Sequence, residues 1–103
     1  MADAVSVLHQ TQTANTPAIA SATIALAANP ARSAWMIQNL GTNALFVLLG
    51  TGASTTVFHA VLKAGTGNDD GTGGSLAQEN GTIYTGAITI AGTSPRYVVT
   101  EQY

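Results

Sequence analysis

The sequence of 103 residues contains no cysteine, so disulfide bonds cannot stabilise the fold and thiolate zinc sites are excluded. Charged residues are also scarce: they make up 8% of the chain, whereas an ordinary soluble domain carries about 25%. No apolar run reaches the roughly 18 residues of a membrane helix, and the first residues lack the pattern of a secretory signal. These absences predict a small domain that is made in the cytoplasm and has no membrane partner.

The three cations, Arg32, Lys63 and Arg96, are far apart in the sequence, and the net charge is -2. Nucleic-acid binding needs clustered Lys and Arg to neutralise phosphates, so we expect no nucleic-acid partner. The low charge has two interpretations. One is an ordinary neutral surface; the other, which we favour, is that further subunits cover much of the surface, because little charge repulsion keeps copies apart.

Period-two hydrophobic spacing and many β-branched residues are what the chain does contain. Gly, Asn and Pro interrupt the apolar runs at short intervals. The pattern predicts an all-β fold: one domain over residues 1–103, an antiparallel, jelly-roll-like β-sandwich of about seven to eight short strands. The strands are expected at residues 5–12, 19–26, 34–39, 44–49, 56–62, 82–84, 86–91 and 96–101.

Three segments need a separate interpretation. Residues 1–17 are a candidate extended N-terminal arm. Residues 17–28 are rich in Ala, with Pro17 placed near a first helical turn, so a helix is the alternative there to the strand that we favour. Residues 64–81 are rich in Gly, Asn and Asp, and we expect an exposed loop that orders on a neighbouring subunit.

No motif for catalysis or cofactor binding is complete in this sequence. The Gly-rich segment lacks the Lys of a phosphate-binding loop. Asn68, Asp69 and Asp70 lack the spacing of an EF-hand, so an Asx turn is favoured over cation binding. His9 and His59 lie on separate predicted strands without a carboxylate cluster. We therefore expect no enzymatic activity, no cofactor and no metal site.

Aromatic residues lie around the two densest apolar runs. Trp35 and Ile37 share one face of the first run, and Phe46 and Leu48 share one face of the next. We expect these four side chains to form the inner faces of a strand pair joined by the turn 40–43. In that position the aromatic rings fill the sandwich, in preference to serving as a ligand platform.

The opposite face of the second run is apolar as well, so it needs cover from another sheet, a loop or another subunit. A homo-oligomer is the simplest source of that cover. Loops and termini are the other expected contact regions, because loops often carry function and termini need to be tied down. The candidate assembly-contact residues are Val5, Val7, Leu45, Val47, Leu49, Asn68, Asp69 and Asp70.

Several short stretches follow one another in a characteristic order. They are Arg32-Ser-Ala-Trp-Met-Ile-Gln-Asn39, then Gly-Thr-Asn, Leu45-Phe-Val with Gly50 after it, a Gly-rich loop, Tyr84-Thr-Gly86-Ala-Ile88 and Val98-Val-Thr-Glu101. In this order the chain resembles the small head-decoration proteins and other accessory structural proteins of tailed bacteriophages. The resemblance covers about residues 30–102.

The resemblance implies a non-enzymatic virion component, made in the host cytoplasm and placed on the outer capsid surface. Such a decoration or cement protein would bridge neighbouring major capsid proteins. Its partners would be the major capsid protein and further copies of itself, with a trimer as the expected oligomer. Two alternatives stay open: a tail, collar or fibre-base subunit, and a carbohydrate-binding adhesion module in which Trp35 or Tyr84 stacks on a sugar.

Overall fold

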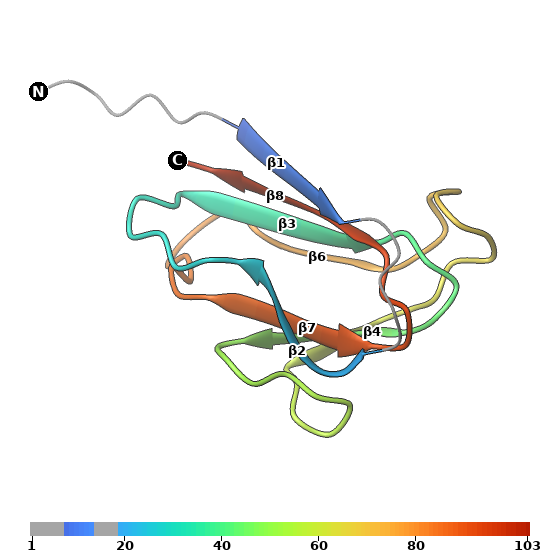
Figure 1. Cartoon of the computed structure of the whole chain (residues 1–103). Coiled ribbons are helices and arrows are strands. Elements are labelled where there is room, and N and C mark those ends of the chain that lie inside the picture. Colours follow the sequence, from blue (N-terminus) through green and yellow to red (C-terminus); the bar gives the residue numbers. More distant parts are fainter. Residues whose placement is uncertain (1–7, 14–18) are drawn as a thin grey trace, which may run out of the picture.

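Two antiparallel sheets of four strands each lie face to face in the part of the chain that the structure describes (Figure 1). The computed structural model describes residues 8–13 and 19–103, with side chains from Thr23 onward. The strands are β1 (Leu8–Thr13), β2 (Ile19–Leu26), β3 (Ala34–Asn39), β4 (Leu45–Leu49), β5 (Ala60–Leu62), β6 (Ser75–Gln78), β7 (Ile88–Gly92) and β8 (Tyr97–Gln102).

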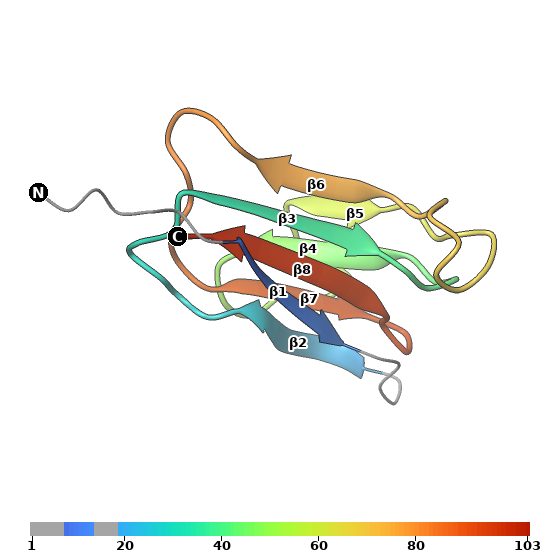
Figure 2. The same ribbon diagram turned by 90° about the horizontal axis from the view of Figure 1, so that it is seen from above.

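The strand order identifies a jelly roll. The first sheet has the order β1-β8-β3-β6 and the second sheet the order β2-β7-β4-β5. Strand β1 pairs with β8, β2 with β7, β3 with β6 and β4 with β5, as if one long antiparallel ribbon had been folded over on itself (Figure 2). This is the double-sheet jelly-roll arrangement. The predicted fold class is therefore confirmed.

The hydrophobic core lies between the two sheets and draws on both of them. Strands β3 and β8 contribute alternate residues from one side, and β4 and β7 contribute theirs from the other. Its fully or almost fully buried members are Ala25, Leu26, Trp35, Ile37, Leu45, Val47, Leu62, Ile88, Ile90, Tyr97 and Val99. Trp35 is therefore a core residue, as expected from the sequence.

Strands β2 and β3 occupy the predicted ranges 19–26 and 34–39. The helix considered for residues 17–28 is not formed where the structure describes that range. Ile19, Thr23 and Ile24 are β-branched, and such side chains favour a pleated strand over a helix.

Two predicted strands are wrong or too long. The strand predicted at 56–62 is reduced to β5, because residues 50–59 form a loop over the second sheet. The strand predicted at 82–84 is absent, and β6 forms instead within the Gly-rich segment 64–81. That segment is thus a tip loop, residues 64–74, followed by an edge strand and a second loop.

The predicted orientation of β4 is also wrong. Leu45 and Val47 are 1% and 0% exposed and face the core, whereas Phe46 and Leu48 lie half-buried on the outer face of the second sheet. Both faces of β4 are apolar, so alternation alone could not decide which face is inner. Leu49 is partly buried and packs against the core.

Strands β3 and β4 belong to different sheets, so residues 40–43 are a crossover and not the turn of a strand pair. The buried Asn39 side chain fixes this crossover. Its Nδ2 donates to the carbonyl oxygens of Asn43 at 2.8 Å, Leu62 at 3.3 Å and Lys63 at 3.2 Å, and its Oδ1 accepts from the Gly41 N–H at 2.9 Å. One amide group therefore joins the end of β3 to the crossover and to the end of β5.

Candidate functional site

A cluster of apolar side chains lies on the outer face of the second sheet, outside the core. We call Phe46, Phe58 and Val61, with the exposed Val57 that precedes Phe58 in the loop, the phenylalanine patch. Val57, Val61 and Phe58 are 52%, 46% and 39% exposed. Val61 lies opposite Phe46 in the β4–β5 ladder, and the Phe46 and Phe58 ring centroids are 5.1 Å apart with tilted planes. Tilted ring pairs at this distance are favourable, so the patch is an ordered surface.

The loop 50–59 that presents Val57 and Phe58 is held to the sheet by hydrogen bonds. The Thr89 hydroxyl accepts from the Ala53 N–H at 3.2 Å and donates to the Gly50 carbonyl at 2.7 Å. Further along the loop, Ser54 Oγ accepts from the Val57 N–H at 2.9 Å. A surface that is ordered before binding loses less conformational entropy when a partner binds.

His59 closes the loop beside the patch. Its backbone N–H donates to the Val47 carbonyl at 2.8 Å, and its ring Nδ1 accepts from the Leu49 backbone N–H at 3.0 Å. The acceptor role at Nδ1 places the proton of the neutral imidazole on Nε2. His59 therefore fixes the entry to β5, and the structure assigns it a structural role within its own chain. The side chain of His9 lies outside the described side chains.

The tip loop 64–74 carries the acidic candidates. Asp69 makes an ion pair with Arg96, with an Nη2–Oδ2 distance of 2.5 Å, and Arg96 lowers the pKa of Asp69. Asp70 accepts from the Thr72 N–H and from the hydroxyls of Thr72 and Thr66, and these bonds lower its pKa from 3.8 to about 2. The bond that the Thr72 N–H donates to Asp70 Oδ1 forms the predicted Asx turn.

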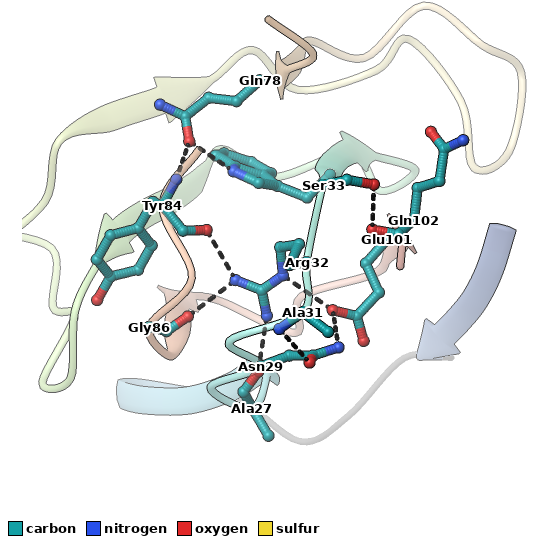
Figure 3. A network of polar contacts seen from close by, with 11 residues as sticks. Ala27, Asn29, Ala31, Arg32, Ser33, Gln78, Tyr84, Gly86, Glu101 and Gln102 are labelled. Carbon is teal, nitrogen blue, oxygen red and sulfur yellow. Dashed lines mark hydrogen bonds and ion pairs between the residues drawn. The ribbon is translucent and has the colours of Figure 1, made fainter. Parts of the chain in front are cut away.

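A second polar network surrounds Arg32, whose side chain is fully buried (Figure 3). Its Nε donates to Glu101 Oε1 at 2.9 Å, and its Nη1 donates to the carbonyl oxygens of Tyr84 and Gly86 at 3.1 and 3.0 Å. Its Nη2 donates to the Ala27 carbonyl at 2.7 Å. Arg32 thus joins three separate segments, and its charge is not available to a ligand.

The aromatic residues considered for sugar stacking belong to the same region of the fold. Trp35 is only 2% exposed, and its Nε1 donates to Gln78 Oε1 at 2.8 Å. The same oxygen accepts from the Tyr84 N–H at 2.9 Å, and Tyr84 packs against the core. A buried indole cannot present its face to a sugar, so Trp35 is removed from the carbohydrate-binding alternative.

A depression of about 330 Å³ lies beside these residues, over the paired ends of β3 and β8. Its lining is Ser33, Ala34, Trp35, Met36, Glu79, Thr100, Glu101 and Gln102. One Glu101 oxygen is already bonded to Arg32 and to Asn29. Among the described residues, no group of three His, Asp or Glu side chains is placed to hold a metal ion.

The predicted contact residues are thus divided among different parts of the molecule. Leu45 and Val47 are corrected to core residues and cannot contact a partner. Asn68, Asp69 and Asp70 are exposed together on the tip loop. Val5 and Val7 lie outside the described residues.

The exposed surface formed by Val57, Phe58 and Val61 was not predicted from the sequence. The signal for it was the excess of apolar residues in 56–62, which was interpreted as a single strand with a buried face. The turn that Ser54 makes with Val57 separates that stretch into a loop and a short strand, and both then expose apolar side chains.

No known protein family, curated protein or solved structure matches this chain. Within the described residues there is no helix long and apolar enough to cross a membrane. The surface and its geometry therefore carry the functional argument.

Proposed function

We propose that this chain is a non-enzymatic structural subunit of a tailed-bacteriophage virion: a decoration or cement protein that binds the outer capsid surface and bridges major capsid proteins. The observation that carries the proposal is the phenylalanine patch, an ordered apolar surface on a domain with 8% charged residues. Apolar surface of this kind, outside the core, is typical of a protein–protein contact.

The jelly-roll topology supports the same proposal, since viral capsid proteins commonly use this fold. Fold alone does not define function, because lectin domains share it. The stretches that resemble head-decoration proteins include Arg32, Asn39 and Glu101, which join crossovers and strands in this structure. Arg32, Asn39 and Glu101 therefore stabilise the scaffold, and the patch supplies the contact surface.

The mechanism proposed is burial of the patch across the boundary between capsid subunits. A subunit that binds only the assembled shell shifts the equilibrium toward assembly by mass action. The ordered loop and the lack of charge reduce the entropic and desolvation costs of such a contact.

The test compares particles that lack the protein with the same particles after purified protein is added. Complete particles and particles refilled with wild type should keep their DNA at a higher temperature than particles without the protein. Phe58→Ser should not restore this resistance, because it places a hydroxyl at the centre of the patch. Met36→Ser is the matched control, since Met36 is 40% exposed, close to the 39% of Phe58, and lies on β3 of the first sheet, away from the patch.

Equal heat resistance of particles with and without the protein would contradict the cementing role. Full restoration by Phe58→Ser would contradict the patch as the capsid contact. Mass spectrometry of separated heads and tails distinguishes the alternative, because a tail, collar or fibre-base subunit would be found in the tail fraction only.

A further inference from the structure

Strand β6 is a free edge of the first sheet. Among the described residues, the sheet order β1-β8-β3-β6 leaves one side of β6 without a neighbouring strand, and β6 lies at the margin of the ribbon in Figure 2. An edge strand exposes backbone donors and acceptors that can pair with another strand.

The backbone groups that face this open side can be identified from the pairing. The Asn39 N–H donates to the Gly74 carbonyl, and Trp35 and Ile37 follow Asn39 at two-residue steps along β3, opposite Gln78 and Leu76. Because the direction alternates along an antiparallel strand, the N–H and C=O groups of the intervening β6 residues point away from β3. Those residues are Ser75 and Ala77, and within the described part of the chain no hydrogen bond occupies their outward groups.

Proteins usually protect an edge with charge, proline or a bulge, and β6 has none of these. Residues 71–78 contain no charged residue and no proline, and the register of β6 with β3 is regular. The outward side chains of β6 are the small Ser75 and Ala77, both exposed. By contrast, the edge strand β2 has two register shifts along its length.

We infer that β6 pairs with β6 of a second copy of this chain, antiparallel and centred on Leu76. In that register Ser75 lies opposite Ala77 of the second copy, and Ala77 opposite Ser75, so each residue pair exchanges two backbone hydrogen bonds. The partly buried Leu76 side chains meet at the centre and cover each other. The nearest acid, Glu79, lies opposite Gly73, so no like charges oppose one another.

The symmetry of this pair bears on the proposed function. Only this part of the inference rests on the proposed function; the pairing of β6 does not. Antiparallel pairing of identical edges in one sheet places the two-fold axis perpendicular to that sheet. Both copies of the second sheet then lie on the same side of the pair, and so do both phenylalanine patches. Two patches on one side bind one large surface with greater avidity than a single patch. The pair differs from the trimer that the resemblance implied.

The absence of cysteine allows a direct test by disulfide formation in purified protein. Leu76→Cys places two thiols across a non-hydrogen-bonded pair, whose Cα atoms are about 4.5 Å apart, within disulfide range. Ile24→Cys is the control, because Ile24 is exposed on β2, the edge strand of the second sheet at the margin opposite β6 (Figure 2). We expect about tenfold more disulfide-linked dimer from Leu76→Cys in a glutathione buffer. Equal or greater yield from Ile24→Cys would overturn the inference.

A second measurement does not depend on the folding of Leu76→Cys. Ala77→Pro removes one outward N–H, and proline is tolerated where the N–H faces away from the ladder. Sedimentation should show concentration-dependent dimers for wild type and for the control Ala77→Val, and monomer for Ala77→Pro. Wild type that stays monomeric, or Ala77→Pro that dimerises equally, would overturn the pair. Wild type that stays monomeric and still restores the heat resistance of particles would overturn the pair while leaving the proposed function intact.

Discussion

Two buried polar side chains, Asn39 and Arg32, determine how the loops of this domain are placed. Each donates to backbone carbonyl oxygens from separate segments: Asn39 joins β3, the crossover and β5, and Arg32 joins three segments around Glu101. Buried carbonyl groups need such donors, because an unpaired polar group in the interior is costly. The role of both residues in this structure is architectural.

Replacing Arg32 should therefore affect stability strongly. Arg32→Ala leaves Glu101, whose side chain is 17% exposed, without its cationic partner, and the expected loss is about 3–5 kcal/mol in the free energy of unfolding. Arg96→Ala is the matched control, because it breaks the exposed ion pair with Asp69 and should cost much less. Urea denaturation monitored by Trp35 fluorescence measures both. Equal losses would contradict the structural role assigned to Arg32.

Asp70 gives the tip loop a defined pH dependence. Its pKa is lowered from 3.8 to about 2 by hydrogen bonds from Thr72 and Thr66. A group whose pKa is lower in the folded state stabilises it above the unfolded value and loses that contribution as the pH falls. The tip loop should thus loosen between about pH 4 and pH 2, as followed by NMR of the Thr72 amide. Asp70→Asn should remove this transition, and an unchanged transition in that variant would assign it to another group.

At the scale of elements, hydrophobic alternation predicted the strands whose two faces differ. In β3, Trp35 and Ile37 are buried whereas Met36 is exposed, so both the range 34–39 and the inner face were correct. In β4 both faces are apolar, and the range was nearly correct but the inner face was wrong. Orientation there depends on the loop 50–59, which packs Phe58 against Phe46 on the outer face and could not be inferred from local sequence.

The strand β6 could not be predicted, because Ser75–Gln78 has no apolar alternation beyond Leu76 and follows a run of glycines. Its position is set by tertiary contacts instead. The Gly74 N–H donates to the Lys63 carbonyl at 2.9 Å, and the Gly74 carbonyl accepts from Asn39. The candidate contact surface was partly missed for the same reason, since the exposure of Val57 and Phe58 depends on how the loop 50–59 folds against the sheet.

Substitution on the two faces tests the corrected orientation. Leu45→Ala removes a side chain that is 1% exposed in the core, and the expected cost is about 2–5 kcal/mol. Val61→Ala removes a side chain that is 46% exposed on the outer face, and its effect should be within about 1 kcal/mol. Thermal or urea unfolding of both variants gives the comparison. A larger loss from Val61→Ala would mean that the outer face contributes to the core of the monomer.

The tip loop approaches β3 so closely at Gly73 that this position should not accept a larger side chain. A Cβ added at Gly73 would overlap the Asn39 carbonyl, so Gly73→Ala must displace the start of β6. Gly81→Ala is the control, since a Cβ there meets nothing within 4 Å and only the positive φ of 75° opposes it. We expect Gly73→Ala to lower the melting temperature more than Gly81→Ala does. The reverse order would contradict the packing described at Asn39.

Three properties of the whole molecule support the proposal that it is buried in an assembly: it has few charged residues, its buried Asn39 and Arg32 side chains are hydrogen-bonded within the chain, and it exposes an apolar patch. Charged residues make up 8% of the chain, and two of its three cations, Arg32 and Arg96, are already paired with carboxylates. Little charge is left to oppose a partner near the patch. A domain of this kind is suited to burial between other subunits of an assembly.

The position of the protein in an intact particle tests this account most directly. Cryo-electron microscopy of whole particles, with particles lacking the protein as the reference, would locate its density and its copy number. The account predicts density on the outer capsid surface, at boundaries between major capsid proteins, with the outer face of the β2-β7-β4-β5 sheet against the shell. Density confined to the tail, or a capsid that is identical with and without the protein, would contradict it.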